Sequence, residues 1–170
     1  MNSNTKAWQR LNDLEDILSL YYEKLKVFQR ELAISSNVDA KFSITKRIER
    51  EIIPYIRQYE TEYANLLASE LNEIEISNED ANIVVVEIQE VVTLAKEVAQ
   101  EKQAERLMNS LEKIENALAK PVSAKGKLQA AIPIIPGIIS YQLELELDPY
   151  NSLVSLWQKI KEKFMKKNYD

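Results

Sequence analysis

The chain contains neither cysteine nor histidine, and only 2 of its 170 residues are glycine. Without cysteine and histidine it can form no disulfide, no zinc site with His or Cys ligands, and no Ser-His or Cys-His nucleophile. With Gly126 and Gly137 as its only glycines, it can form neither a phosphate-binding Walker loop nor a dinucleotide-binding turn. The sequence therefore argues against an enzyme and predicts no catalytic residue, cofactor site or metal site.

Carboxylates are the remaining candidates for metal ligands, and an acidic run lies between residues 70 and 80. Its carboxylates are Glu70, Glu73, Glu75, Glu79 and Asp80. The run lacks the regularly spaced oxygen ligands and the turn glycine of a calcium loop, so we interpret it as a solvated charged segment. A carboxylate-metal hydrolase stays as a remote alternative.

The net charge of −5 argues against nucleic-acid binding, because phosphate contacts need a basic surface. Polar residues follow Met1 closely, so no secretory signal is predicted. The most apolar window, 130–139, is about half a membrane span long and contains Pro133 and Pro136. We therefore expect a cytoplasmic protein and no membrane association.

The first 70 residues carry the clearest helical pattern. Apolar residues form a heptad seam, stepping alternately by three and four: Leu11, Leu14, Leu18, Tyr21, Leu25, Phe28 and Leu32. This seam predicts a helix over about 5–34, and Leu18, Tyr21 and Leu25 are candidate interaction residues on its surface. After the polar stretch "SSNVDA", in which Asp39 can cap the next helix, apolar residues return at helical spacing: Ile48, Ile52, Tyr55 or Ile56, Tyr59, Tyr63 and Leu66. Two helices of similar length with a short linker predict an antiparallel hairpin over 1–70.

Pro54 and the acidic run after residue 68 indicate where the second helix of this hairpin bends and where it ends. Pro54 lies inside it, and the apolar pattern resumes in phase afterwards, so we expect a kink; a break is the weaker alternative. The tyrosines of this helix are expected to pack against the first helix rather than to stack on bases, because acidic residues neighbour them. The boundary with the second unit, 77–170, is expected at 68–77.

The sequence of the second unit predicts mostly helices. Ser77 and Asp80 resemble a capping box that starts a new helix. The β-branched run at 83–88 could be a strand, but the spacing of Val84, Ile88 and Val91 favours a helix. A hinge near 100–103, a further helix that stops before Pro121, and a short helix over about 124–132 complete this part.

The stretch "AIPIIPGIISYQLELELDPY" departs from this helical pattern. Two prolines and a glycine precede a strict alternation of apolar and polar residues, which predicts a strand over about 138–148. Its apolar face would carry Tyr141, Leu143, Leu145 and Leu147, four candidate interaction residues. A lone strand leaves one row of backbone groups unpaired, so we expect it to pair with a second copy or with a partner protein.

The last helix is expected to start at the Asp148-Pro149 pair. Its apolar face would be formed by Leu153, Trp157, Ile160 and Phe164, with Trp157 as a candidate interaction residue. Five lysines, Lys159, Lys161, Lys163, Lys166 and Lys167, follow closely. An amphipathic helix that covers the core is the favoured interpretation, and a peripheral membrane-associating helix is the alternative.

Two stretches resemble known modules. "YYEKLKVFQRELAI" followed by "DAKFSITKRIEREI" is similar to a helical hairpin of cyanobacterial proteins that lies beside NACHT-type (STAND) NTPase, caspase-like or TIR modules. The segment from "LEKIENALAKPVSAKGKLQAA" to "IPIIPGIISYQLELELD" resembles an accessory region of the same proteins. The resemblance implies an effector-associated adaptor without catalytic residues, whose partner would be a STAND NTPase or a caspase-like effector.

These observations together predict a mainly α protein: a long antiparallel helical hairpin followed by a small α+β unit with one β-strand. The predicted function is that of a non-catalytic interaction or adaptor module. We expect it to form a homo-oligomer or to dock on a signalling or conflict-system effector.

Overall fold

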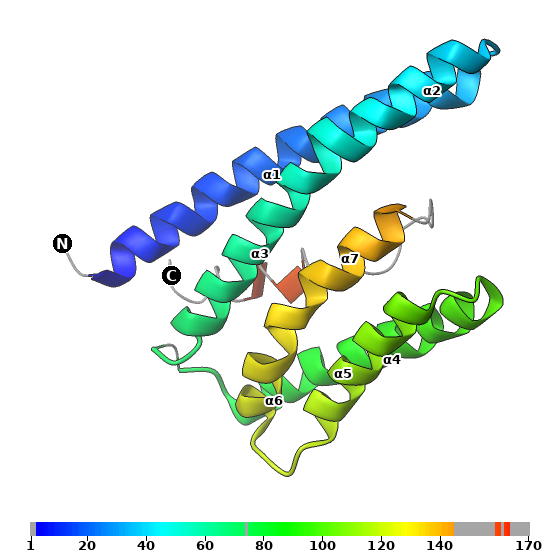
Figure 1. Ribbon diagram of the computed structural model, residues 1–170. Coiled ribbons are helices and arrows are strands. Elements are labelled where there is room, and N and C mark those ends of the chain that lie inside the picture. The colour runs from blue at the N-terminus through cyan, green and yellow to red at the C-terminus, as the bar shows by residue number, and fades with distance from the viewer. Residues whose placement is uncertain (1–2, 74, 145–158, 161, 164–170) are drawn as a thin grey trace. The chain divides into compact units, whose positions relative to one another are not determined.

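The computed structural model describes residues 3–73, 75–144, 159–160 and 162–163 (Figure 1). Every regular element in these residues is a helix, and no strand occurs among them. The chain divides into two compact units, Met1–Tyr63 and Ala64–Asp170. Each unit is therefore described by itself.

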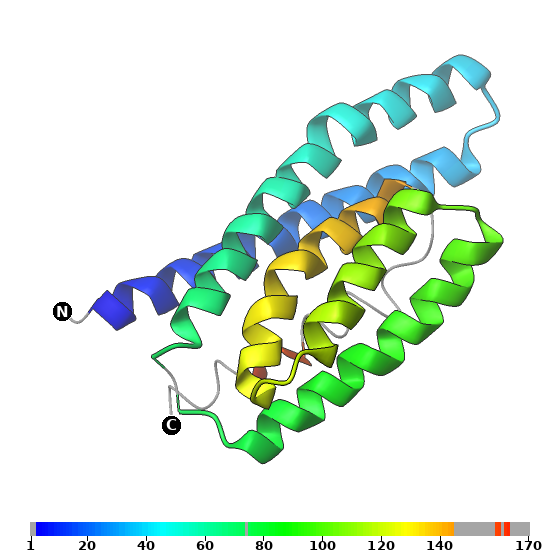
Figure 2. The same ribbon diagram turned by 60° about the horizontal axis from the view of Figure 1, so that its bottom comes forward.

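The first unit is a helical hairpin. Helix α1 (Ser3–Ile34) is followed by α2 (Val38–Arg47), a π-helical turn η1 (Ile48–Ile52) and α3 (Ile53–Glu70), whose last residues belong to the second unit. Figures 1 and 2 both show α1 lying beside the α2–η1 stretch, with the short connection 35–37 at one end. Asn37 is the N-cap of α2, because its side-chain oxygen accepts from Asp39 N at 2.9 Å and Ala40 N at 3.3 Å. Asp39, the predicted cap, instead lies in the first turn.

The heptad seam of α1 is the buried face of the hairpin. Its buried residues are Trp8, Leu11, Leu14, Leu18, Tyr22, Leu25 and Phe28. The facing helical stretch buries Ile52, Ile53, Ile56 and Tyr63. Tyr22 takes the buried place that the sequence pattern predicted for Tyr21, which is half-buried at the edge of the seam. The predicted helix over 5–34 is confirmed.

Pro54 does not end the second arm of the hairpin, since α2, η1 and α3 follow one another without a gap. A proline has no N–H to donate to the carbonyl four residues back, so a regular α-helix would lose a hydrogen bond here. The preceding turn widens into a π-helix, in which Ile53 N–H donates to the carbonyl of Ile48 five residues back. The wider turn lets the helix pass the proline.

The second unit holds α4 (Asn78–Glu101), α5 (Glu105–Ala119), α6 (Ala124–Ala131), the 3-10 turn η2 (Ile132–Ile134) and α7 (Ile135–Glu144). Helix α4 packs against α5 and α6, and α5 also packs against α6 and α7. The Ser77 hydroxyl accepts from Asp80 N at 3.1 Å and caps α4, as the sequence predicted. The β-branched run at 83–88 is helical, because it lies within α4 and buries Val84, Val85 and Ile88 toward α5 and α6.

The turn between α4 and α5 falls where the hinge was expected. Gln103 has φ = 53°, in the left-handed region that usually requires glycine. Two backbone bonds close the turn: Ala104 N–H donates to Ala99 O at 3.0 Å, and Gln103 N–H donates to Gln100 O at 3.2 Å. This pair of bonds is the Schellman arrangement, so glutamine here takes the place that glycine usually fills.

The predicted strand over 138–148 is wrong for its described part, because residues 138–144 belong to helix α7. Prolines are tolerated in the first turn of a helix, where no N–H is needed, and Pro133 and Pro136 occupy such positions in η2 and α7. Ile132, Ile135, Ile138 and Ile139 repeat at helical spacing and are fully buried. Burial of this isoleucine face stabilises a helix more than the alternation that follows it stabilises a strand. The predicted α+β unit is therefore wrong: its described residues are all helical. Residues 145–148 lie outside the described residues.

The predicted C-terminal helix is described only at 159–160 and 162–163, which are helical. Ile160 is fully buried, whereas Lys159, Glu162 and Lys163 are exposed. This burial agrees with a helix that turns an apolar face inward. Leu153, Trp157 and Phe164 lie outside the described residues.

Candidate interaction surfaces

The candidate residues that the sequence predicted on the hairpin are internal contacts. Leu18 and Leu25 are 0% and 1% exposed, so neither is available to a partner. Tyr21 stacks on Tyr55, with ring centroids 5.6 Å apart, and lies 5.7 Å from the ring of Tyr59. These tyrosines therefore join the two arms of the hairpin, as stacked aromatic pairs do in cores.

The candidate residues of the predicted strand do not form an open sheet edge. Tyr141 and Leu143 lie in α7, where the backbone is helical and offers no extended row of N–H and C=O groups to a partner strand. Leu145, Leu147 and Trp157 lie outside the described residues. Pairing through a strand edge at 138–144 is thus excluded.

A second apolar row runs along α1 on the side away from the seam. Leu20, Val27 and Ile34 are 66%, 50% and 83% exposed and repeat every seven residues. Each follows a seam position by two residues, which turns it by roughly 200° around the helix. We call this surface, together with Lys24 and Glu31 between its apolar residues, the outer row of α1.

The two charged members of the outer row are exposed, and neither forms an ion pair with any described residue. They lie seven residues apart, one basic and one acidic. Charges at intervening positions of a heptad row select partner and orientation in helix pairs. The outer row is therefore an apolar stripe with its own charge pattern.

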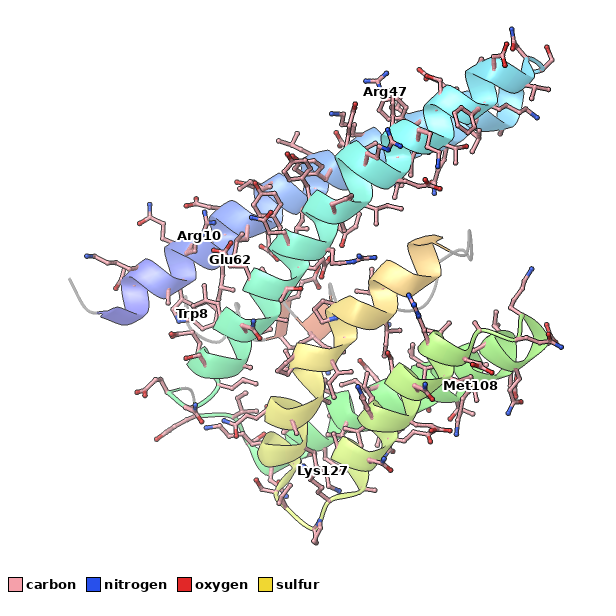
Figure 3. The ribbon with its side chains drawn as sticks, in the orientation of Figure 1. Trp8, Arg10, Arg47, Glu62, Met108 and Lys127 are labelled. Atoms are coloured by element: carbon pink, nitrogen blue, oxygen red, sulfur yellow. The ribbon has the colours of Figure 1, made fainter. Side chains whose placement is uncertain are left out.

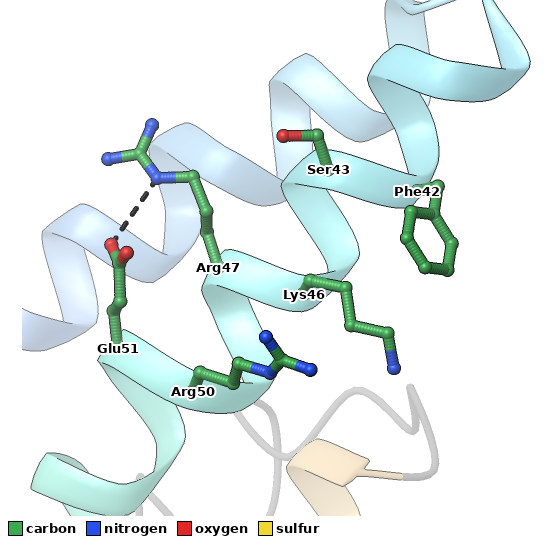
Figure 4. A pocket seen from close by; sticks show the side chains of 6 residues that line it. All are labelled: Phe42, Ser43, Lys46, Arg47, Arg50 and Glu51. Atoms are coloured by element: carbon green, nitrogen blue, oxygen red, sulfur yellow. Dashed lines mark hydrogen bonds and ion pairs between the residues drawn. The ribbon is translucent and has the colours of Figure 1, made fainter.

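The end of the hairpin carries a shallow pocket of about 320 Å³ on the surface of α2 and η1. It is lined by Phe42, Ser43, Lys46, Arg47, Arg50 and Glu51. Figure 4 shows Phe42, Lys46 and Arg50 along one side of it, and Ser43, Arg47 and Glu51 along the other. Three of the six side chains are basic in a chain of net charge −5, so this hairpin-end pocket is locally positive.

The basic groups of the pocket differ in their contacts. Arg47 donates to Glu51 at 3.3 Å and places its guanidinium 4.6 Å from the ring centroid of Phe28. Lys46 is 3.1 Å from Glu49 and 5.5 Å from the ring centroid of Phe42. Arg50 is exposed and forms no ion pair with any described residue. Arg50 is therefore the cation most available to an incoming anion.

In the second unit, α4 exposes a further set of apolar side chains. Ile83, Val86, Leu94 and Val98 are between 38% and 58% exposed. Glu90 interrupts the row that Val86, Leu94 and Val98 form at four-residue spacing. These side chains form a second exposed apolar surface among the described residues.

In the part of the chain that the structure describes, no group of three or more acidic side chains could hold a metal ion. Burial and the neighbouring Glu73 carboxylate raise the pKa of Glu70. Elsewhere, Arg10 and Glu62, labelled side by side in Figure 3, form an ion pair across the hairpin. Arg10 Nε lies 2.8 Å from Glu62 Oε1. This exposed pair adds at most about 1 kcal/mol to stability.

The tyrosines of α3 do not form a stacking platform. Tyr63 is fully buried, and burial together with the Glu15 and Glu60 carboxylates raises its pKa strongly. Tyr59 is half-buried and Tyr55 is 44% exposed beside Tyr21. The expected packing of these side chains against α1 is therefore seen for the described rings.

Sequence reasoning missed the outer row and the hairpin-end pocket. The heptad spacing of Leu20, Val27 and Ile34 is visible in the sequence. From sequence alone, however, a single apolar residue at every seventh position cannot be distinguished from apolar residues scattered over the surface. Arg50 and Glu51 of the pocket lie in the π-helical turn, which the sequence pattern did not predict. Both surfaces became recognisable once the buried face of each helix was known.

No protein-family model, curated protein or solved structure matches this chain. None of the helices in the described residues is both long and apolar enough to cross a membrane.

Proposed function

We propose that the protein is a non-catalytic interaction module that self-associates through the outer row of α1. The observation that carries this proposal is the exposed heptad row of Leu20, Val27 and Ile34, which lies opposite the buried seam. A helix with two apolar faces is stable in water when both faces are covered. The hairpin covers only one of them.

The occupant of the outer row that we propose is a second copy of α1 in antiparallel orientation. A two-fold axis near Val27 brings Lys24 of each copy toward Glu31 of the other, and Leu20 toward Ile34. Opposite charges then face one another across the pair, and two-fold pairs are the commonest form of self-association.

A dimer of this kind would serve as an adaptor. The resemblance of the hairpin and of the segment 111–148 to effector-associated regions supports a STAND NTPase or a caspase-like protein as the downstream partner. Dimerisation would then bring two effector molecules together and raise their local concentration. Membrane association through the C-terminal helix receives no comparable support, because Ile160 is buried.

Sedimentation of the full chain and of matched double variants tests the proposal. The wild-type protein is expected to form dimers at roughly 100 µM, as helix pairs with a few apolar contacts associate weakly. Leu20→Glu with Val27→Glu is expected to give a monomer with unchanged helix content. Leu94→Glu with Val86→Glu, the same two replacements on the exposed face of α4, is the control and should leave the dimer intact. A monomeric wild-type chain, or a dimer lost only in the control, would contradict the proposal.

A charge exchange tests the orientation. Lys24→Glu is expected to weaken the dimer, because it places an acid opposite Glu31 of the other copy. Adding Glu31→Lys to the same chain restores opposite charges in the antiparallel arrangement and should restore association. If both variants dimerise as the wild type does, the antiparallel pairing near Val27 is wrong.

A further inference from the structure

The hairpin-end pocket lies on a different surface from the outer row, and its side chains form two ridges. Phe42, Lys46 and Arg50 follow one another at four-residue spacing, and Ser43, Arg47 and Glu51 do the same beside them. Rows at this spacing form the ridges of a helix surface, with a groove between them. The π-helical turn Ile48–Ile52 lies under the Arg50 end of the groove.

The charge available in this groove is positive. The Glu51 carboxylate is occupied by Arg47, so it offers little repulsion to an incoming anion. Lys46 shares its charge with the exposed Glu49, and Arg50 has no partner among the described residues. An anion placed between Lys46 and Arg50 would therefore gain at least one new ion pair and the donors of a guanidinium fork.

Exposed apolar side chains lie beside the pocket on α2. Val38, the first residue of α2, is 79% exposed. Phe42 is 64% exposed and lies one turn beyond Val38, at the rim of the pocket. These two neighbouring side chains offer an apolar contact to a partner.

We infer that the hairpin end docks an acidic segment of a partner protein. A carboxylate of that segment binds between Lys46 and Arg50, and a neighbouring apolar side chain packs on Phe42 and Val38. Interfaces of this type combine an aromatic anchor with charged groups at its edge. The inference does not depend on self-association, because neither Leu20 nor Val27 takes part.

An anionic membrane surface is the other occupant with matching chemistry, and the charges near the pocket argue against it. The exposed Asp39 and Glu49 lie near the basic residues, and the whole chain carries −5. A lipid surface would repel these carboxylates wherever they face it. A protein segment can instead place its own charges to match individual side chains.

Titration of the full chain with a short capped peptide of glutamates around one phenylalanine tests the inference. Amide resonances of residues 42–51 are expected to shift, with a saturable dependence on peptide concentration. A peptide in which every glutamate is replaced by glutamine should bind at least about tenfold more weakly, as should the acidic peptide at high salt. Equal binding of the acidic and the neutral peptide would overturn the inference.

Matched charge reversals locate the site. Lys46→Glu with Arg50→Glu is expected to abolish binding of the acidic peptide and to create binding of a lysine-phenylalanine peptide. Lys113→Glu with Arg106→Glu, an exposed lysine and arginine on α5, makes the same change in net charge and should leave binding unchanged. Phe42→Ala should weaken binding of the acidic peptide without removing its salt dependence.

Binding to lipid vesicles tests whether a membrane surface, rather than a protein segment, occupies the pocket. Flotation with vesicles of phosphatidylcholine and phosphatidylserine is expected to leave the protein unbound at physiological salt. Vesicle binding that is lost in the Lys46→Glu, Arg50→Glu variant, but not in the Arg106, Lys113 control, would assign the surface to lipid and overturn the inference. Loss of the dimer in the Leu20, Val27 variant with peptide binding retained would separate this site from the proposed self-association.

Discussion

Proline falls within a helical stretch in both units, and the chain accommodates it in opposite ways. Before Pro54 the helix widens into the π turn Ile48–Ile52, and Ile53 N–H reaches the carbonyl five residues back. Around Pro133 the helix tightens into the 3-10 turn Ile132–Ile134, and Ile135 N–H reaches the carbonyl three residues back. In both places the helical path continues past the proline.

The difference shows that the neighbouring turns decide what a proline does. Pro54 is the second residue of α3, and the turn that leads into it without a gap is the wide π turn. Pro133 and Pro136 each lie in the first turn of a new element, where a missing N–H costs nothing. Pro54 and Pro133 therefore mark a change in helix geometry rather than the end of the helical path, whereas Pro121 follows the end of α5.

The largest expected effect comes from the isoleucines next to the prolines. Ile52 and Ile135 are both fully buried, and replacing either by alanine is expected to lower the free energy of unfolding by about 2–5 kcal/mol. Ile83→Ala, at a position that is 44% exposed, is the control and should cost less than about 1 kcal/mol. Urea denaturation measures all three. If Ile135→Ala costs no more than the control, residues 132–139 do not form a buried helix face.

The prolines themselves should respond differently to replacement. Pro54→Ala is expected to raise the free energy of unfolding by about 1–2 kcal/mol, since alanine restores the missing donor inside the helix. Pro136→Ala should change it by less than about 1 kcal/mol, because Ile135 already donates to the Ile132 carbonyl. Equal effects of the two replacements would show that Pro54 and Pro136 affect the stability of their helices equally.

The two glycines allow a finer test of the same helices. Gly137 is exposed in the first turn of α7, and an added Cβ would meet no atom within 4 Å. Gly137→Ala is therefore expected to stabilise the protein by roughly 0.5–1 kcal/mol. At Gly126 the Cβ would lie 3.2 Å from Val122 Cγ2, so Gly126→Ala should give a smaller gain or none. Thermal unfolding that ranks Gly126→Ala above Gly137→Ala would argue against a helix at 137.

The smallest expected effect belongs to a helix end that has neither proline nor glycine. Gln103 adopts φ = 53°, which costs most residues energy and glycine none. Gln103→Gly is expected to raise stability by about 0.5 kcal/mol, since part of the gain is offset by greater chain entropy in the unfolded state. A melting temperature below that of the wild type would show that the glutamine side chain stabilises this turn.

Much of the hairpin and of α4 could be predicted from the sequence. The seam of Leu11, Leu14, Leu18 and Leu25 matched its burial, because a heptad row specifies one inward face whatever it packs against. Ser77 marked the start of α4, since a capping serine acts within a few residues of the chain. The prediction of a helix rather than a strand over 83–88 also held, because the spacing of its apolar residues outweighed its β-branched composition.

The candidate sites were less predictable. The strand prediction rested on the alternation at 141–147 and did not use the helical spacing of Ile132, Ile135 and Ile139, which are fully buried. Alternation over a few residues does not distinguish a strand from the end of a helix that is apolar on several sides. The exposed surfaces of the hairpin were missed because exposure belongs to the packed structure and not to any one segment.

The sequence by itself determined the chemistry that this protein lacks, the period of its longest helix and the caps that start its helices, since these depend on residue identity and near neighbours. Tertiary structure decided which apolar residues are buried, how the prolines are passed and which charges remain without partners. Those outcomes depend on contacts between segments far apart in the chain. Leu18 and Leu20 make the point: two leucines two residues apart, one buried in the seam and one left open on the outer row.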